Sequence, residues 1–600
     1  MSLVEFLQDL VIKRWEFWIE DEQVCFRAPE LESTAVILTQ LKQRKAQILE
    51  LLQEQSEILE VYPLSYGAKG LWFLWQLAPQ SYNYNVSVAL RIYSQVDIRS
   101  WQQAFQSLKQ RHPMLRSTFP KVGEQPIQQV HQNQPLDFLQ IDAATWSEDQ
   151  LHEKVQEAHQ HPFDITTEPV MRVRWFTRSE QDHIMLVTIQ HIAWDGWSRN
   201  LIVKELPQLY QAQVSGMEVS LPPLKYSYPD YVRWQTELLE GPKGESLWNY
   251  WQAKLAGELP VLNLPIDRPR LPLQTDNGGS YSFKLSAKLT EQLKQLAQTE
   301  DVTLYMLLLT AFQVLLFRYT NQEDILVGSP TNGRSRAEFA PIVGYFVDLM
   351  VMRANLSRNP CFRELLSQVR QIVMGALAHQ DYPFPLLVER LQPKRDPNLS
   401  PLFQAYFVLQ KLIEFQDMQE LFLSVGLKIE KFALTHCENS FDLSLEMVEE
   451  DSYLLGRFKY SADLFDQQTI ARMAVHFETL LASIVTNPQQ RVGKLPLLSE
   501  IEQLWIQGKR VPQTDIETAR KIQPRVKPRN EVEHQIAQIW QELLGVAQIG
   551  IYDNFFTLGG HSLLVIKLMN KIEQEFSKSL PLSILFQSPT IKQLATLLSQ

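Results

Sequence analysis

The chain has few cysteines, no long apolar run and no strongly basic block, and each absence excludes a class of protein. Its three cysteines, Cys25, Cys361 and Cys437, lie far apart and form no CxxC pair. This spacing argues against a zinc site or a disulfide framework and predicts a reducing, cytoplasmic location. No run reaches the ~18 apolar residues that a membrane span requires. Residues 1–18 mix charges with apolar side chains, unlike a signal peptide, so we expect a soluble protein without membrane contact.

The charge balance does not favour nucleic acid as a partner. The 600 residues include 68 acidic and 57 basic side chains, which gives a net charge of −11. A protein that binds phosphate backbones instead concentrates lysine and arginine on one face. The chain is too long for a single hydrophobic core, and a prior of ~150 residues per domain predicts three or four units.

Residues 1–55 have the pattern of a small α-β-β-α-α unit. A helical apolar pattern begins at Leu3, and two short strand-like runs, residues 17–19 and 24–26, flank a polar turn. This unit resembles the N-terminal docking domains of the tubulysin type, which occur on nonribosomal peptide synthetases and hybrid polyketide assembly lines. The resemblance implies that the hairpin edge accepts a C-terminal segment of an upstream synthetase or polyketide synthase subunit. A helical cap on the next domain is the alternative.

The long middle part, residues 61–498, alternates apolar strand-like runs with amphipathic helices. Mixed strands and helices over such a length predict an α/β fold in two lobes. We expect one lobe over about residues 61–235 and the other over about residues 275–498. The proline-rich segment 259–272 looks extended and is expected to join them.

The main catalytic signal follows an apolar run that ends at Ile189. Gln190 and His191 come next, with Asp195 and Gly196 four and five residues after the histidine. This pattern resembles the HHxxxDG signature of condensation domains, which belong to the superfamily of chloramphenicol acetyltransferase. Six companion segments occur in the expected order: residues 64–66 with 71–74, residues 111–119, residues 228–231, residues 343–348, residues 379–384, and residues 395–396 with 401–404.

The resemblance implies a role for each residue of the signature. An imidazole exchanges protons near neutral pH, so His191 can accept a proton from an amine that attacks a thioester, or can hydrogen-bond the resulting adduct. Asp195 is expected to brace the turn by pairing with Arg334 of the other lobe. Gly196 permits close approach of the backbone to a substrate arm.

Two positions depart from the family pattern. Gln190 replaces the first histidine of the signature and has no titratable proton, although its amide can donate and accept hydrogen bonds. We therefore expect reduced or specialised activity rather than none. Asp348 stands where the family often shows asparagine, and an acid that points inward there would place negative charge near the substrate tunnel.

Close to the C-terminus, Ser562 follows Gly559, Gly560 and His561 and opens an apolar-periodic helix. An ordinary helix N-cap is the commonest role of such a serine. Residues 530–600, however, resemble a four-helix peptidyl carrier domain, in which this serine carries a covalent 4′-phosphopantetheine arm. The resemblance implies that a phosphopantetheinyl transferase modifies Ser562. It implies no metal site.

The segment between the two main domains is short. Residues 499–529 are mostly polar and are expected to form a linker. The flanking sequences resemble those that normally lead into and out of an adenylation domain, yet no adenylation domain fits between them. The sequence also shows no glycine-rich phosphate loop elsewhere. We therefore expect a separate adenylating enzyme, acting in trans, to load the carrier.

Together these features predict a docking–condensation–carrier protein of a nonribosomal peptide assembly line. It would be an acyltransferase that joins an upstream acyl or peptidyl thioester to an aminoacyl group on Ser562, with formation of an amide. Three alternatives remain open: an ester-forming enzyme of the same fold, an epimerising one, and a catalytically weak scaffold in which Gln190 marks a decayed site.

Overall fold

The computed structural model describes most of the middle of the chain and parts of both ends. The described residues are 10, 16–20, 23–27, 34–45, 58–122, 125–217, 221–270, 277–393, 399–410, 415–434, 441–450, 452–498, 528–544, 546, 549–553, 555, 558, 568, 571–572, 575–576, 578 and 590–599. The predicted linker and the helical pattern that begins at Leu3 lie almost entirely outside them.

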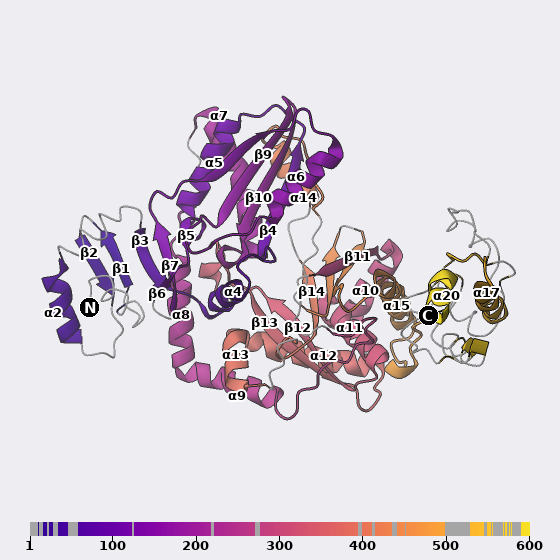
Figure 1. The fold of residues 1–600 in the computed structure, drawn as a ribbon. Coiled ribbons are helices and arrows are strands. Elements are labelled where there is room, and N and C mark those ends of the chain that lie inside the picture. Colours follow the sequence, from indigo (N-terminus) through magenta and orange to yellow (C-terminus); the bar gives the residue numbers. More distant parts are fainter. Residues whose placement is uncertain are drawn as a thin grey trace. The chain divides into compact units, whose positions relative to one another are not determined.

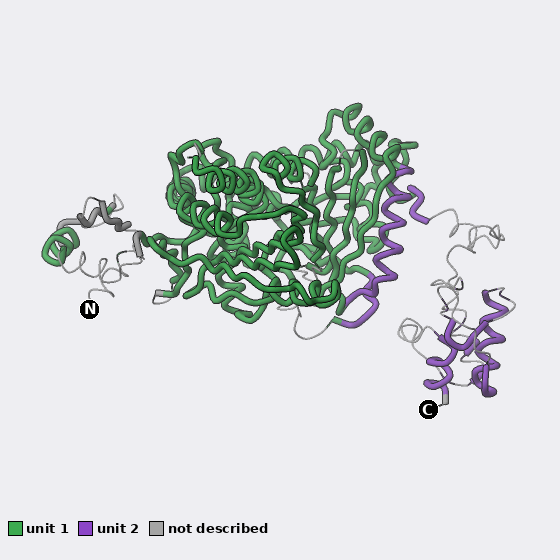
Figure 2. The backbone as a smooth tube through the Cα atoms, turned by 90° about the horizontal axis from the view of Figure 1, so that it is seen from above, with its two compact units in different colours: residues 1–264, 270–463, 484–494 green, residues 265–269, 464–483, 495–600 purple. Residues whose placement is uncertain are grey.

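The chain forms two compact units (Figure 2). One unit consists of residues 1–264, 270–463 and 484–494. The other consists of residues 265–269, 464–483 and 495–600.

The N-terminal hairpin continues a sheet of the first unit (Figure 1). The sheet has the strand order β2-β1-β3-β7-β5, with β6 also paired to β7, and Phe17 pairs with Val61 where the hairpin meets β3. The two predicted strand runs are confirmed as β1 and β2. The elements of this region are β1 (Glu16–Glu20), β2 (Gln23–Arg27), α2 (Thr34–Gln43), β3 (Ile58–Pro63), β5 (Ser117–Thr118), β6 (Lys121–Val122) and β7 (Gln125–His131).

A second sheet, of order β15-β4-β10-β9-β8, forms the centre of the first lobe. Both of its faces are covered, which explains why the central strand β10 is buried along nearly its whole length. Trp101 of α5 and Leu206 of α7 pack on one face, and Leu151 of α6 packs on the other. The elements are β4 (Asn85–Ile92), α5 (Ile98–Arg111), β8 (Asp137–Asp142), α6 (Glu148–Gln160), β9 (Met171–Ser179), β10 (Asp182–Gln190), α7 (Gly196–Ser215) and β15 (Ile429–Lys431).

The third sheet, of order β11-β17-β16-β14-β12-β13, belongs to the second lobe. Helix α11 is apolar nearly all round and buried along most of its length, as expected for a helix within a core. The elements are β11 (Gly278–Lys284), α10 (Ala287–Thr299), α11 (Leu304–Thr320), β12 (Asp324–Thr331), β13 (Asp348–Asn355), α12 (Phe362–Ala378), α13 (Phe384–Leu391), β14 (Ala405–Gln410), β16 (Leu443–Glu449) and β17 (Leu454–Ser461).

One segment crosses from the second lobe to the first, which corrects the expected boundaries. Helix α14 (Phe415–Leu423) packs on α7, and β15 adds an edge strand beside β4. Phe422 stacks on Trp101 with 6.1 Å between ring centroids. The second lobe is therefore not one continuous stretch over residues 275–498, because its crossing segment completes the core of the first lobe.

The second unit contains the described part of the C-terminal domain. Helices α17 (Glu531–Leu544) and α20 (Ile591–Ser599) share a core in which Trp540 and Leu594 are fully buried. Within the described residues no single helix is long and apolar enough to cross a membrane; only the bent pair α10 and α11 passes that test, by length and composition alone.

Candidate active site

His191 lies directly after β10, in a short 3₁₀ turn that ends before α7 begins. Its Nδ1 atom is 2.7 Å from the carbonyl oxygen of Trp194. A carbonyl oxygen can only accept a hydrogen bond, so Nδ1 of His191 must carry the hydrogen. In the neutral imidazole, Nε2 therefore holds the free lone pair. The turn fixes the tautomer that a general base requires.

Asp195 caps the N-terminus of α7 with a fully buried carboxylate. Its Oδ1 atom accepts the backbone N–H of Ser198 at 2.8 Å, and its Oδ2 atom accepts that of Phe346 at 3.1 Å. The guanidinium of Arg334 donates to Oδ2 at 2.6 Å, and the side chains of Arg334 and Asp195 are only 2% and 0% exposed. The expected ion pair between the lobes is thus present, and Asp195 braces the turn with all its acceptors directed at protein donors.

Arg334 is held from several sides. It donates to the hydroxyl of Ser198 and to the carbonyl of Ile342, each at 3.0 Å, and it lies 4.0 Å over the ring of Phe346. The preceding Gly333 has φ +63°, and a Cβ atom there would come within 1.7 Å of the Phe346 carbonyl oxygen. This position therefore requires glycine.

The hydroxyl of Ser198 was not singled out by the sequence, yet it links the two lobes. It donates to the carbonyl of Gly344 at 3.0 Å and accepts that residue's N–H at 3.1 Å. Because Ser198 lies three residues after an N-cap aspartate, the sequence predicts only the hydrogen bond from its backbone N–H to Asp195. The side-chain contact depends on a loop 146 residues away, which no local pattern reveals.

Three of the companion segments meet beside this turn. The hydroxyl of Tyr228, on α8 (Tyr228–Glu240), donates to the carbonyl of Tyr345 at 2.5 Å. The same hydroxyl lies 2.9 Å from that of Ser65, which caps α4 (Tyr66–Leu77). The ring of Tyr345 in turn contacts the imidazole of His191 edge-on, with 5.1 Å between centroids and 90° between planes.

Gln190 stabilises the turn through its side-chain amide. Its side-chain oxygen accepts the N–H of Ile192 at 2.6 Å, and the residue is buried. The amide thus caps the 3₁₀ turn that carries His191. Gly196, which is exposed, begins α7 directly after the Asp195 cap.

Asp348 holds the N-terminus of α13. Its carboxylate accepts the N–H of Phe384 at 3.0 Å and that of Leu349 at 2.8 Å. Pro383 precedes this helix and offers no capping side chain, so Asp348 supplies the missing acceptor. Burial raises the pKa of Asp348 to about 7, although both N–H donors act to lower it. The acid expected near the tunnel is therefore engaged with a helix end.

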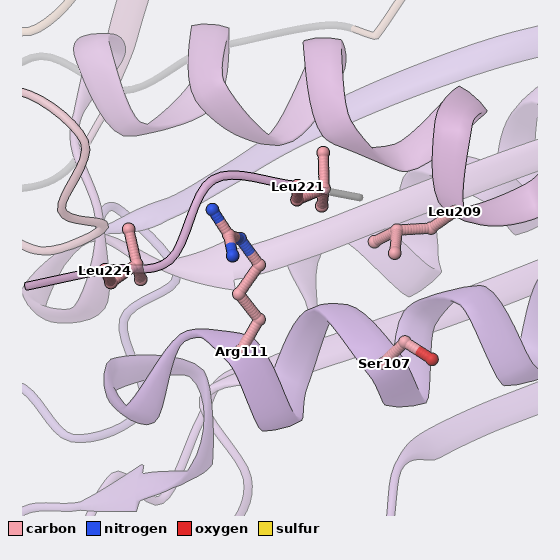
Figure 3. A pocket seen from close by; sticks show the side chains of 5 residues that line it. All are labelled: Ser107, Arg111, Leu209, Leu221 and Leu224. Carbon is pink, nitrogen blue, oxygen red and sulfur yellow. The ribbon is translucent and has the colours of Figure 1, made fainter. Parts of the chain in front are cut away.

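One pocket of about 440 Å³ lies on the first lobe, between α5 and α7 (Figure 3). Ser107, Arg111, Leu209, Leu221 and Leu224 line it. None of the predicted site residues is among them. In this pocket the guanidinium of Arg111 donates to Glu205 and to the carbonyl of Pro222.

Ser562 lies outside the described residues. On either side of it along the chain, Phe555 and Leu568 are fully buried in the core of the C-terminal domain, and the ring of Phe555 contacts Trp540 at 4.9 Å. The described residues before and after the serine along the chain thus belong to the folded core of the C-terminal domain.

Comparisons with known families agree with this geometry. Residues 58–506 match the condensation domain, residues 534–598 match the phosphopantetheine attachment site, and residues 3–54 match the TubC N-terminal docking domain. The chain therefore belongs to the condensation-domain family. With its docking and carrier domains it is a condensation–carrier protein of the nonribosomal peptide synthetase type, and its cofactor is a 4′-phosphopantetheine attached to a carrier serine.

Curated relatives are much longer than this chain. One polypeptide of the linear gramicidin synthase of Brevibacillus parabrevis is 38% identical over 491 residues, which cover 81% of this chain and 9% of the relative. Chondramide synthase cmdD of Chondromyces crocatus is 36% identical over 454 residues, with 74% and 11% covered. The chain thus spans about a tenth of the length of these relatives.

A solved structure shares the fold over most of its length. The X-domain from teicoplanin biosynthesis aligns with a TM-score of 0.66 at 25% identity and covers 73% of this chain and 97% of its own. A four-domain nonribosomal peptide synthetase bound to AMP and glycine aligns with a TM-score of 0.68 at 22% identity, over 86% of this chain and 39% of its own, which supports the fold alone.

Proposed function

We propose that the chain is an acyltransferase that joins an upstream acyl or peptidyl thioester to an amine acceptor. The observation that carries the proposal is the imidazole of His191, whose Nδ1–H is committed to the Trp194 carbonyl while Nε2 is left as a base. The buried pair of Asp195 and Arg334 holds this turn against the second lobe. The base therefore lies where the two lobes meet.

In the proposed reaction, His191 accepts a proton at Nε2 from the attacking amine. The amine nitrogen bonds to the carbonyl carbon of the donor, the carbon–sulfur bond breaks, and the upstream thiol leaves with the proton that His191 returns. General base catalysis of this kind contributes roughly 10²–10⁴-fold. Asp195 and Arg334 touch no reacting atom in this scheme and act by positioning the turn.

Ser562 is the proposed attachment residue. A serine hydroxyl can form the phosphodiester that holds the arm, and the arm supplies a thiol on which the acceptor is carried. A phosphopantetheinyl transferase must install it. We further propose that a separate adenylating enzyme loads the acceptor, because only residues 507–533 separate the two matched domains.

The docking hairpin is the proposed contact for the upstream subunit. Strand β1 already pairs on both sides, with β2 and with β3, so its backbone is occupied. Strand β2 ends the sheet in the described structure and would have to accept any added strand.

Intact mass spectrometry tests the function. The chain is loaded on Ser562 with an aminoacyl group, a donor thioester is supplied, and the summed mass is sought. His191→Ala should slow product formation by about 10²–10⁴-fold without unfolding the chain. His152→Ala is the matched control, because that imidazole is exposed on α6 and stacks on Phe432.

The alternatives give different results in the same assay. An undiminished rate in His191→Ala would place the chemistry elsewhere. Exchange of the α-proton without a summed mass would indicate epimerisation. Formation of an ester when a hydroxyl acceptor replaces the amine would indicate an ester-forming enzyme. No reaction of either kind, with docking intact, would indicate a scaffold.

A further inference from the structure

The phenol of Tyr345 is the polar side-chain group that the structure places in ring contact with His191. The ring lies edge-on to the imidazole, with 5.1 Å between centroids. Other tyrosines bond their hydroxyls within the protein: that of the nearby Tyr228 donates to a carbonyl, and that of Tyr305 donates to Ser329 at 2.7 Å. The Tyr345 hydroxyl has no hydrogen-bond partner among the described residues, and the side chain is only partly exposed.

The backbone on both sides of Tyr345 is fixed. Gly344 is bonded twice to the hydroxyl of Ser198, and the N–H of Phe346 is bonded to Asp195. The carbonyl of Tyr345 itself accepts from Tyr228. On α4, Gly67 leaves just enough room for the ring, because a Cβ atom there would lie 3.0 Å from it. The backbone that carries the phenol is therefore fixed by the same contacts that hold the catalytic turn, and Gly67 bounds the ring on one side.

The phenol also stays protonated. Burial raises the pKa of Tyr345 well above its ordinary value, and the nearby Asp348 acts in the same direction. A neutral phenol is a hydrogen-bond donor at any pH at which the reaction can run. A fixed, protonated donor beside a general base is the arrangement that stabilises a developing oxyanion.

We propose that Tyr345 is a further catalytic residue, whose hydroxyl donates a hydrogen bond to the carbonyl oxygen of the donor thioester. This inference rests on the proposed function. As the amine nitrogen bonds to the carbonyl carbon, the π electrons move to that oxygen, and the Tyr345 O–H stabilises the charge without transferring its proton. When the carbon–oxygen double bond re-forms, the carbon–sulfur bond breaks, and His191 gives the proton that it took from the amine nitrogen to the leaving sulfur.

Tyr345→Phe tests the proposal, because it keeps the ring against His191 and removes only a hydroxyl without a described partner. We expect kcat to fall by about 10- to 100-fold, with the melting temperature nearly unchanged and the KM for the donor raised by no more than about 10-fold, the value of one ground-state hydrogen bond; loss of a single oxyanion donor in other enzymes costs up to about 10²–10³-fold. Tyr305→Phe is the matched control: it loses an internal hydrogen bond and should keep its turnover. An unchanged kcat in Tyr345→Phe would overturn the proposal.

A second measurement needs no turnover. Two acyl-pantetheine analogues are titrated, a ketone in which CH₂ replaces the sulfur and a thioether in which CH₂ replaces the carbonyl. The wild-type chain should prefer the ketone, and Tyr345→Phe should lose about 3- to 10-fold of that preference, the value of one hydrogen bond. A retained preference would place the contact elsewhere even if kcat falls. An inactive wild-type chain that still shows the shift would refute the proposed function and leave this contact standing.

Discussion

Removal of the guanidinium of Arg334 would leave a charge inside the protein with too few partners. The carboxylate of Asp195 is completely buried and lies 2.6 Å from that guanidinium. In Arg334→Ala it keeps the N–H groups of Ser198 and Phe346 but loses its counter-charge. Breaking a buried ion pair in this way typically costs about 3–5 kcal/mol of unfolding free energy. The two remaining donors lead us to expect a loss of about 3 kcal/mol.

A double-mutant cycle isolates the pair. Urea unfolding, followed by tryptophan fluorescence, is measured for Arg334→Ala, Asp195→Ala and the double variant. Each single change strands one buried charge, whereas the double variant removes both. The double variant should therefore be hardly less stable than either single one, with a coupling energy of about 2–3 kcal/mol.

A surface pair provides the comparison. Arg370 and Asp301 are also 2.6 Å apart, but their side chains are 45% and 85% exposed. The same cycle on this pair should give a coupling below about 1 kcal/mol, because water screens exposed charges. Additive losses at Arg334 and Asp195, within about 0.5 kcal/mol, would refute the view that the two lobes are clamped by a buried charge pair.

Two further variants test other parts of the structure. Burial raises the pKa of Asp348 to about 7 from an ordinary value near 3.8. Between these pH values the folded chain holds a proton that the unfolded chain has lost, so the free energy of unfolding falls as pH rises through this window. Asp348→Asn should flatten this decline, and its free energy of unfolding in urea titrations should exceed that of the wild type by about 1–3 kcal/mol at pH 8. If the free energy of unfolding of the variant still fell between pH 5 and 8 as steeply as that of the wild type, Asp348 would not be the cause. Ser562→Ala should abolish the mass gain of one pantetheine while costing the carrier only about 1 kcal/mol, as circular dichroism would show; modification that persists would move the attachment site.

The catalytic turn was predictable because its signals are local. The apolar run up to Ile189 predicts a strand, and β10 ends at the next residue. Asp195 is a favoured N-cap residue, and α7 begins directly after it. The pairing with Arg334 came from the family resemblance instead, since 139 residues separate the two side chains.

Other features depend on contacts that no local pattern records. The short strand β15 could have joined either lobe, and only its pairing with β4 decides between them. The cap of α13 comes from Asp348, 36 residues upstream, because the proline before the helix cannot supply one. That the Tyr345 hydroxyl has no partner among the described residues is likewise invisible in the sequence, because it depends on which groups the surrounding side chains bond.

The departure at Gln190 can be judged from the geometry of the turn. Nδ1 of His191 is oriented by the Trp194 carbonyl and its ring by Tyr345, so no contact of Gln190 sets the tautomer. What Gln190 supplies is a neutral acceptor for the N–H of Ile192. The acceptor nitrogen of a neutral imidazole could fill that role, and an amide oxygen fills it at every pH. The replacement thus keeps the function that the structure assigns to the position, which favours an active site over a decayed one.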